Sequence, residues 1–283
     1  MRALAAQGFF VHVGDQRFAH TSFSRTLRSD CPLGVRNLTL LGGSEWNWAA
    51  WGGLADTVRT GVPAFIARYG KDLYSYFAED APEAGVIFNR SMSESGRWTS
   101  GPVADALDVT GLKTVADVGG GEGGLLRMLL DRHRNLRGVL VDSEHVVGQA
   151  DPDLREGTLA ARCEIVPADI RTAVPCVADL YVLRQVMHIW DDDMCVQILR
   201  NCLAGASPGV RIVLVEHLVN DDPEQKPTPA FTTQIDLLMM LIGRGRERTR
   251  EDFARIMAEA GLEFSGTTAT PLPLHLITGV LAG

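Results

Sequence analysis

Apolar residues in the second half of the chain occur in short runs that alternate with longer amphipathic segments. Runs of strand length are predicted at residues 114–118, 138–142, 163–166, 179–183 and 210–216. Helical periodicity lies between several of them; within residues 191–203, for example, Met194, Ile198 and Leu199 form one apolar stripe. Buried strands that alternate with amphipathic helices are typical of a parallel sheet. We therefore predict an α/β domain here.

The C-terminal end of the chain has a different pattern. Helical periodicity at residues 231–242 and 250–260 is followed by two strand-like runs, 262–268 and 274–281, with Pro271 and Pro273 between them. Gly261 ends the second of these helices. Neighbouring strands with a short connection pair antiparallel, so the sequence predicts a hairpin that closes the sheet.

The N-terminal region is mainly helical in pattern from residue 44 to residue 107. Before it, a short helix at residues 2–7 precedes two strand-like runs, 8–13 and 17–21, around Gly14-Asp15-Gln16, which predict a β-hairpin. A helix followed by a hairpin matches the second half of a winged helix, so we expect a chain shortened at its N-terminus that dimerises weakly. Next to Gly101-Pro102 we place the boundary between a helical, partial winged-helix dimerisation domain (1–100) and a catalytic domain (101–283).

The composition of the chain disfavours several classes of function. The chain has 283 residues, 46% of them hydrophobic, which suffices for a sizeable core. Its net charge of −8 opposes nucleic-acid binding, so a DNA-binding regulator is the least favoured hypothesis. Five scattered cysteines without a C-x-x-C pair predict reduced thiols in a cytoplasmic protein. No apolar run reaches the ~18 residues that a membrane span needs.

The run at residues 115–118 ends in a cluster of glycines and is followed by a helix that begins near Leu125. Glycines let the backbone approach a ligand closely, and the helix N-terminus beyond them carries partial positive charge. Asp117 lies beside this loop, and Asp142 ends the next strand-like run. Acidic side chains at adjacent strand ends are suited to bind a nucleoside.

Two cofactors fit this pattern. Gly119, Gly121 and Gly124 match the dinucleotide motif G-x-G-x-x-G, and Asp142 lies 18 residues beyond Gly124, so NAD is a legitimate alternative. However, a charge at Asp117 would repel a pyrophosphate and attract an ammonium or sulfonium group. The late position of the motif and the C-terminal hairpin also favour S-adenosylmethionine (SAM).

Three sequence blocks carry a resemblance to a known family. They are DVGGGEG at residues 117–123, LRQVMHIW at 183–190 with the helix that follows, and GRERT at 245–249; FNRSM at 88–92 accompanies them. In order and spacing they resemble the SAM-dependent small-molecule O-methyltransferases, including plant caffeate-type and bacterial anthracycline enzymes. The resemblance implies a class I methyltransferase fold, a Rossmann-like sheet with a C-terminal antiparallel hairpin, and a homodimer.

The resemblance also implies roles for single residues. It places Asp117, Gly119 and Gly121 at the methionine end of SAM, Asp142 and Ser143 at the ribose, and Asp169 and Ile170 at the adenine, with Arg184 where the family usually has lysine. His188 would be the general base, flanked by Glu216 and Glu247. Phe88, Met92 and Trp190 would contact an aromatic acceptor. S-adenosylhomocysteine (SAH) would be the product, and no metal is implied.

The chemistry agrees with this hypothesis. A phenol with a pKa of about 10 is mostly protonated at neutral pH, and an imidazole with a pKa near 6.5 can remove its proton as the new bond forms. Ile189 stands where the family commonly has aspartate, which keeps open a SAM-assisted hydroxylase or cyclase.

Plainer roles also remain open for several of these residues. His188 could be an ordinary hydrogen-bonded histidine, and Phe88 and Met92 could be core residues. Glu216 could pair with an arginine at its strand end. Glu247 could belong to a salt-bridge cluster with its arginine neighbours.

Overall fold

A seven-stranded sheet forms the centre of the computed structural model, which describes residues 1–220 and 228–283. The strand order is β5-β4-β3-β6-β7-β9-β8. The strands are β3 (Thr114–Val118), β4 (Arg137–Asp142), β5 (Cys163–Pro167), β6 (Leu180–Arg184), β7 (Arg211–Glu216), β8 (Leu262–Ala269) and β9 (His275–Leu281). The first five are parallel, whereas β9 is antiparallel to both of its neighbours. The predicted C-terminal hairpin is therefore confirmed.

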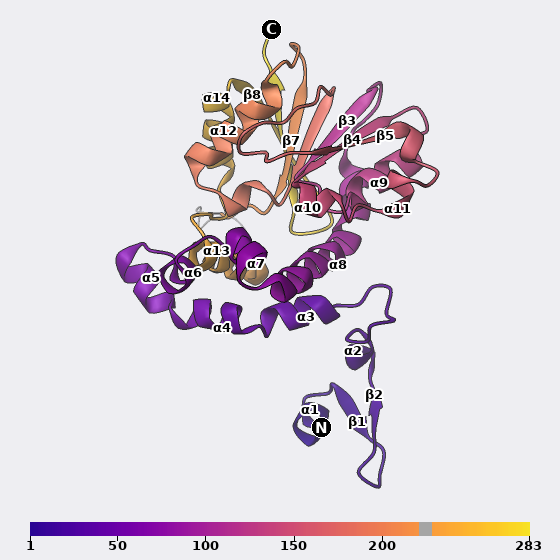
Figure 1. Ribbon diagram of the computed structural model, residues 1–283, viewed down its shortest axis with the longest axis vertical. Coiled ribbons are helices and arrows are strands. Elements are labelled where there is room, and N and C mark those ends of the chain that lie inside the picture. The colour runs from indigo at the N-terminus through magenta and orange to yellow at the C-terminus, as the bar shows by residue number, and fades with distance from the viewer. Residues whose placement is uncertain (221–227) are drawn as a thin grey trace.

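Helices cover both faces of this sheet (Figure 1). One face carries α9 (Gly124–Arg132), α10 (Glu144–Val147) and α11 (Pro152–Arg155), and the other carries α12 (Asp192–Leu203) and α14 (Arg250–Ala260). Two short 3-10 turns, η1 (Ala160–Arg162) and η2 (Met187–Ile189), precede β5 and α12.

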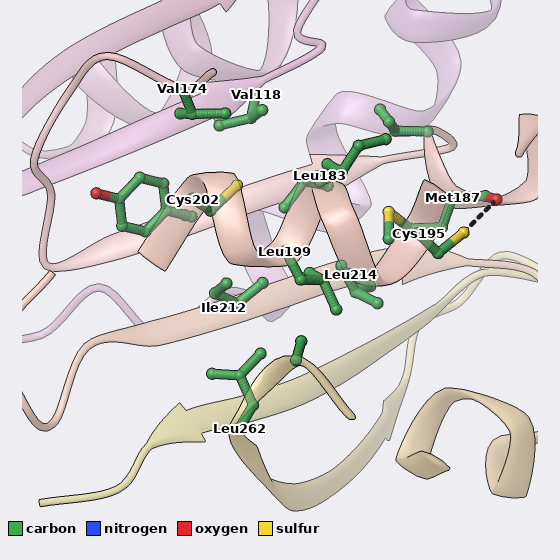
Figure 2. Close-up of a cluster of buried hydrophobic side chains, with 14 of the residues drawn as sticks. Val118, Val174, Leu183, Met187, Cys195, Leu199, Cys202, Ile212, Leu214 and Leu262 are labelled. Carbon is green, nitrogen blue, oxygen red and sulfur yellow. Dashed lines mark hydrogen bonds between the residues drawn. The ribbon is translucent and has the colours of Figure 1, made fainter. Parts of the chain in front are cut away.

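Alternation along β3 divides its side chains between the two faces, as strand geometry requires. Ala116 and Val118 belong to the core under α12 and α14, whereas Val115 belongs to the core under α9. Figure 2 shows part of the first core, where Leu199 of α12 packs near Ile212 and Leu214 of β7. Because the inner parallel strands β3, β4, β6 and β7 are buried on both faces, their sequences are nearly continuous apolar runs.

A helical layer lies below the carboxyl ends of the parallel strands (Figure 1). It contains α3 (Arg36–Gly42), α4 (Glu45–Gly52), α5 (Leu54–Thr60), α6 (Ala64–Tyr69), α7 (Leu73–Glu79), α8 (Pro82–Ala106) and α13 (Ala230–Ile242). Trp46, Phe65, Leu73 and Phe77 form its own core. Helix α13 comes from the C-terminal half of the chain but contacts α4, α5 and α6. The predicted boundary between residues 100 and 101 falls inside α8, which runs on to Ala106 without a break.

The N-terminal arm, residues 1–35, stands apart from the rest of the molecule (Figure 1). It contains α1 (Arg2–Ala6), β1 (Phe10–His12), β2 (Phe18–His20) and α2 (Ser22–Arg25). Strands β1 and β2 pair antiparallel, with Phe10 opposite His20, so the predicted hairpin is confirmed. No helix among the described residues combines the length and the hydropathy that a bilayer crossing requires.

Candidate functional site

Two buried carboxyl groups lie at the ends of the adjacent parallel strands β3 and β4. Asp117 is 1% exposed, and neither of its carboxyl oxygens has a hydrogen-bond partner among the described residues. Asp142 is better satisfied, because Oδ2 accepts from the Gly121 N–H at 2.9 Å and Oδ1 from the Ser143 N–H at 2.7 Å. Burial raises the pKa of Asp117 to about 6; Arg184 and the nearby Leu126 backbone N–H oppose this, and the charge of Asp142 adds to it. Burial also raises the pKa of Asp142.

The glycine loop after β3 brings the backbone close to these carboxyl groups. Gly119 and Gly121 have φ values of +68° and +62°, which side chains rarely adopt. A Cβ atom at Gly120 would lie only 2.6 Å from the Asp117 Cγ. Gly120 was not among the predicted site residues, although its place in the glycine run could have marked it. The loop therefore packs its backbone directly against the buried Asp117 carboxyl group at the end of β3.

Asp169 and Ile170, the predicted adenine contacts, already have partners within the protein. Arg171 donates to both carboxyl oxygens of Asp169, with Nη2 at 2.8 Å from Oδ2 and Nε at 2.9 Å from Oδ1. The same guanidinium group lies 5.5 Å from the centre of the Trp190 ring. Ile170 is half-buried and packs against the core under α12. Asp169 thus has a charged partner within the protein that the sequence did not indicate.

Arg184, at the end of β6, connects the sheet to α8. Its Nη1 donates to Thr99 Oγ1 at 2.9 Å and to Ser100 Oγ at 3.0 Å. Burial lowers the pKa of this guanidinium group, and the charge of Asp117 acts in the opposite direction. Arg184 therefore lies close enough to Asp117 to offset part of its charge, while its hydrogen bonds go to the helical layer.

A second group of buried polar residues surrounds His188. The His188 Nδ1 lies 2.8 Å from Glu247 Oε1. Glu216 Oε1 accepts hydrogen bonds from the backbone N–H groups of Val186 at 2.9 Å and Met187 at 2.8 Å. Ligand-type atoms of the three side chains all lie within 4.8 Å of one another. Elements far apart in the chain, η2, β7 and the segment before α14, thus meet at one point.

The electrostatics of this cluster are coupled. Burial disfavours a charged His188, but the hydrogen bond to Glu247 and the charges of Glu216 and Glu247 outweigh it, so the pKa of His188 is raised. Burial raises the pKa of Glu216 to about 7, His188 opposes this, and Glu247 adds to it. A buried imidazole beside carboxylates can take up a proton near neutral pH. The spacing would also admit a metal ion, but the hydrogen bond already joins two of the three groups.

The alternative roles of Glu216 and Glu247, pairing with arginines, can be compared with the observed contacts. Glu247 has His188 as its only ionic partner in the described part of the chain, whereas Arg246 and Arg248 both pair with Asp192. Glu216 is hydrogen-bonded to the backbone of the turn that carries His188. Neither carboxyl group is part of an arginine cluster.

The residues predicted to contact the aromatic acceptor lie close to aromatic side chains of the helical layer. Phe88 packs edge-on against Tyr74, with ring centres 6.0 Å apart, and lies 5.3 Å from Phe77. Trp190 is stacked on Tyr74 at 6.4 Å, and Met92 is 44% exposed. An acceptor role for these residues stays a prediction, but Phe88 and Trp190 share Tyr74 as a neighbour.

Tyr74 and three other residues near the site were missed by sequence reasoning. Asp236 of α13 accepts from the Glu247 N–H at 2.8 Å. The buried Arg248 and the half-buried Asp192 form an ion pair beside the His188 turn. Asp191 caps α12 by accepting from the Met194 N–H, and Asp192 lies in the first turn of that helix. Partners so far apart in the chain leave no local pattern.

Comparisons with known proteins give a consistent result. Residues 51–263 match the model of the O-methyltransferase domain family. The chain is 35% identical over 263 residues to the mitomycin biosynthesis 6-O-methyltransferase of Streptomyces lavendulae, covering 93% of this chain and 74% of that protein. It is also 32% identical over 234 residues to the aclacinomycin 10-hydroxylase of Streptomyces purpurascens, covering 81% of this chain and 62% of that one.

A solved structure resembles the whole chain. The O-methyltransferase of neocarzinostatin biosynthesis, crystallised with SAM and 2-hydroxy-5-methyl naphthoic acid, superposes with a TM-score of 0.84 at 29% identity. The match covers 99% of this chain and 83% of that one. The similarity therefore includes the strand ends, the glycine loop and the helical layer.

Proposed function

We propose that this chain, which belongs to the family of SAM-dependent O-methyltransferases, methylates a phenolic hydroxyl group of an aromatic, polyketide-like metabolite with His188 as general base. The observation that carries the proposal is the buried His188–Glu247 pair at 2.8 Å, at the same edge of the sheet as the glycine loop. Ligands of open α/β sheets bind at this edge.

The residues at β3 and β4 fit SAM. Asp117 offers two buried carboxyl oxygens without a protein partner, which suits a ligand that carries positive charge. Asp142 and Ser143 are suited to the ribose hydroxyls, Gly119 and Gly121 to the methionine end, and Asp169, Ile170 and Arg184 to the rest of the cofactor. When bound, SAM supplies an electrophilic methyl group on a sulfonium.

His188 would remove the acceptor proton. Glu247 lies at Nδ1, so a neutral imidazole that keeps its proton on Nδ1 presents Nε2 as the base. Proton uptake at Nε2 creates an imidazolium that the Glu247 carboxylate stabilises. Such a base contributes about 10²- to 10⁴-fold in rate, while alignment of acceptor and donor contributes the larger part.

An aromatic acceptor is supported by the side chains next to the base. Trp190 is two residues beyond His188 and stacks on Tyr74, which contacts Phe88. Flat aromatic surfaces favour flat aromatic ligands through burial and offset stacking. Phe88, Met92 and Trp190 are therefore the proposed contacts of the acceptor ring.

Assembly as a homodimer through the region of residues 1–100 is part of the same proposal. Phe9, Val11, Val13 and Phe23 of the N-terminal arm are 38%, 50%, 52% and 68% exposed. Apolar side chains on an arm that stands apart from the molecule favour burial against a second copy. We further propose a cytoplasmic location and no nucleic-acid, membrane or metal partner.

The proposal is tested by incubating the protein with methyl-labelled SAM and a panel of aromatic polyketides that carry free phenols. We expect labelled product whose mass increases by one methyl group, together with SAH. Gain of an oxygen atom without label would favour the SAM-assisted hydroxylase alternative, and absence of SAM binding in calorimetry would contradict both.

A further inference from the structure

Arg248 is the largest fully buried side chain among the described residues, yet the proposed reaction gives it no role. It directly follows Glu247, and its guanidinium group lies under the turn that carries His188. Nη1 donates to the Met187 carbonyl at 2.9 Å and Nη2 to the Trp190 carbonyl at 2.7 Å. The two carbonyl groups lie on either side of His188 in the sequence. One side chain thus holds both ends of the turn η2.

The remaining contacts of Arg248 join this turn to its surroundings. Nε donates to Asp192 Oδ1 at 2.9 Å, at the start of α12. Its backbone carbonyl accepts from the Val219 N–H at 3.1 Å, just beyond the strand that ends in Glu216. The Met187 carbonyl also accepts a hydrogen bond from the Cys195 thiol, with Sγ at 3.2 Å; Figure 2 draws this bond. Arg248 is thus bonded to the turn that carries His188, follows Glu247 directly, and pairs through its backbone with the segment just beyond Glu216.

A buried guanidinium group is a costly way to fill space. Removing a charge from water is expensive, and an apolar side chain of similar volume commonly gives equal or greater stability. Arginine differs from such a side chain, and from lysine, by a rigid planar fork that can hold several acceptors in fixed directions. The contacts of Arg248 use this fork, since its nitrogens reach the carbonyl groups of Met187 and Trp190, a third carbonyl at Arg246, and the carboxylate of Asp192.

Resting on the proposed function, we propose that Arg248 is a positioning residue for the general base, which fixes the His188 turn so that Nδ1 meets Glu247. The neighbouring backbone is equally constrained, because a Cβ atom at Gly245 would overlap the His188 carbonyl oxygen. A turn held at both ends keeps the imidazole at one angle to the acceptor. Small errors in such an angle reduce the rate strongly.

The charge of Arg248 has a second consequence for His188. The charged and titratable groups around the imidazole are Glu247, Glu216, Arg248 and the neighbouring His217, and Arg248 is the cation that lowers the pKa of His188. Asp192 remains ionised beside Arg248, because hydrogen bonds from Arg255 and Arg248 outweigh burial and lower its pKa to about 2. Loss of Arg248 would therefore favour the protonated imidazole, which cannot act as a base.

The test compares Arg248→Met and Arg248→Lys with the matched variants Arg246→Met and Arg246→Lys. Arg246 also pairs with Asp192, but its side chain is 45% exposed, and within the described residues its hydrogen bonds go to Asp192 and Asp252 and not to the turn. For Arg248→Met we expect kcat to fall about 100-fold, with little change in KM for SAM, and the acidic limb of the pH profile to move to higher pH. Arg248→Lys should lower kcat with a much smaller movement of the limb, because it keeps the charge but loses the fork.

Several outcomes would overturn the inference. One is a folded Arg248→Met protein with wild-type kcat and pH profile, and another is an equal effect from the Arg246 variants. If Arg248→Met does not fold, Arg248→Lys decides, since wild-type kcat in that variant contradicts a need for the fork. These outcomes can be distinguished from a failure of the proposed function. That failure would appear as an absence of methylated product with the wild-type protein, or as full activity of His188→Ala.

Discussion

The two halves of the site lie at the same edge of one sheet but satisfy their buried carboxyl groups differently. In the base half, Glu247 Oε1 is hydrogen-bonded to His188 and Glu216 Oε1 to the backbone of its turn, while the second oxygen of each has no partner among the described residues. In the cofactor half, Asp117 has no hydrogen-bond partner among the described residues. A buried polar group without a partner is unfavourable. The base half thus has a protein partner for each carboxyl group, whereas we expect a cationic ligand to complete the cofactor half.

The largest expected effect comes from breaking the base half alone. His188→Ala should lower kcat by about 10²- to 10⁴-fold, because the acceptor loses its general base. Binding of SAH, measured by calorimetry, should stay within about twofold, since Asp117 and the glycine loop are untouched. His133→Ala, at an exposed position after α9, is the control. Full activity of His188→Ala would leave only proximity as the source of catalysis.

Breaking the cofactor half should give the opposite pattern. Asp117→Asn removes a buried charge that we expect to face the cationic end of SAM, so the affinity for SAM should fall on the order of 10- to 100-fold. The pH at which kcat reaches half its maximum should not move. Asp131→Asn, on the exposed side of α9, provides a matched control. An unchanged Kd for SAM in Asp117→Asn would show that the ligand does not complete this half.

Titration separates the two halves further. The pKa of Asp117 is about 6 and a cation prefers the ionised carboxylate, so SAM affinity should fall roughly tenfold between pH 8 and pH 5. The base half depends on pH in its own range, because the raised pKa of His188 places the acidic limb of kcat above pH 6.5. Calorimetry across this range is the measurement. In Asp117→Asn the decline in affinity should disappear, and its persistence would assign it to another group.

The smallest effect is expected from Glu216→Gln. Glutamine keeps an oxygen that can accept from the Val186 and Met187 N–H groups, but removes a carboxyl group whose pKa is about 7. Loss of its negative charge lowers the pKa of His188, so the acidic limb of kcat should move to lower pH, with a change in kcat of less than about tenfold. A limb that moves to higher pH would contradict the proposed coupling.

Much of the α/β domain was predictable from local patterns. The strand at residues 114–118 has the predicted ends. Each of the other predicted strands agrees with β4–β9 to within one residue at both ends. Buried parallel strands are apolar on both faces, so each leaves a complete signal in its own residues. The glycine loop was equally visible, since positive φ values at Gly119 and Gly121 depend on the residue type itself.

Contacts between distant elements left no such signal. Sequence reasoning paired Asp169 with the adenine but did not foresee Arg171, and it did not foresee the ion pair between Asp192 and Arg248. The domain boundary expected at Gly101-Pro102 stays a prediction, although α8 passes through that dipeptide. A proline within a helix weakens it locally, but packing against α9 and α3 holds α8 together.

The sequence by itself determined the order of strands and helices, the glycine loop and the types of side chain at the strand ends, because these depend on short-range sterics and on periodic burial. Only the tertiary structure decided that Glu247 meets His188 rather than an arginine, that Arg248 lies beneath their turn, and that neither Asp117 oxygen makes a full hydrogen bond to the described residues. Those arrangements depend on how elements 30 to 61 residues apart pack together, and on which buried groups then find a partner of opposite charge.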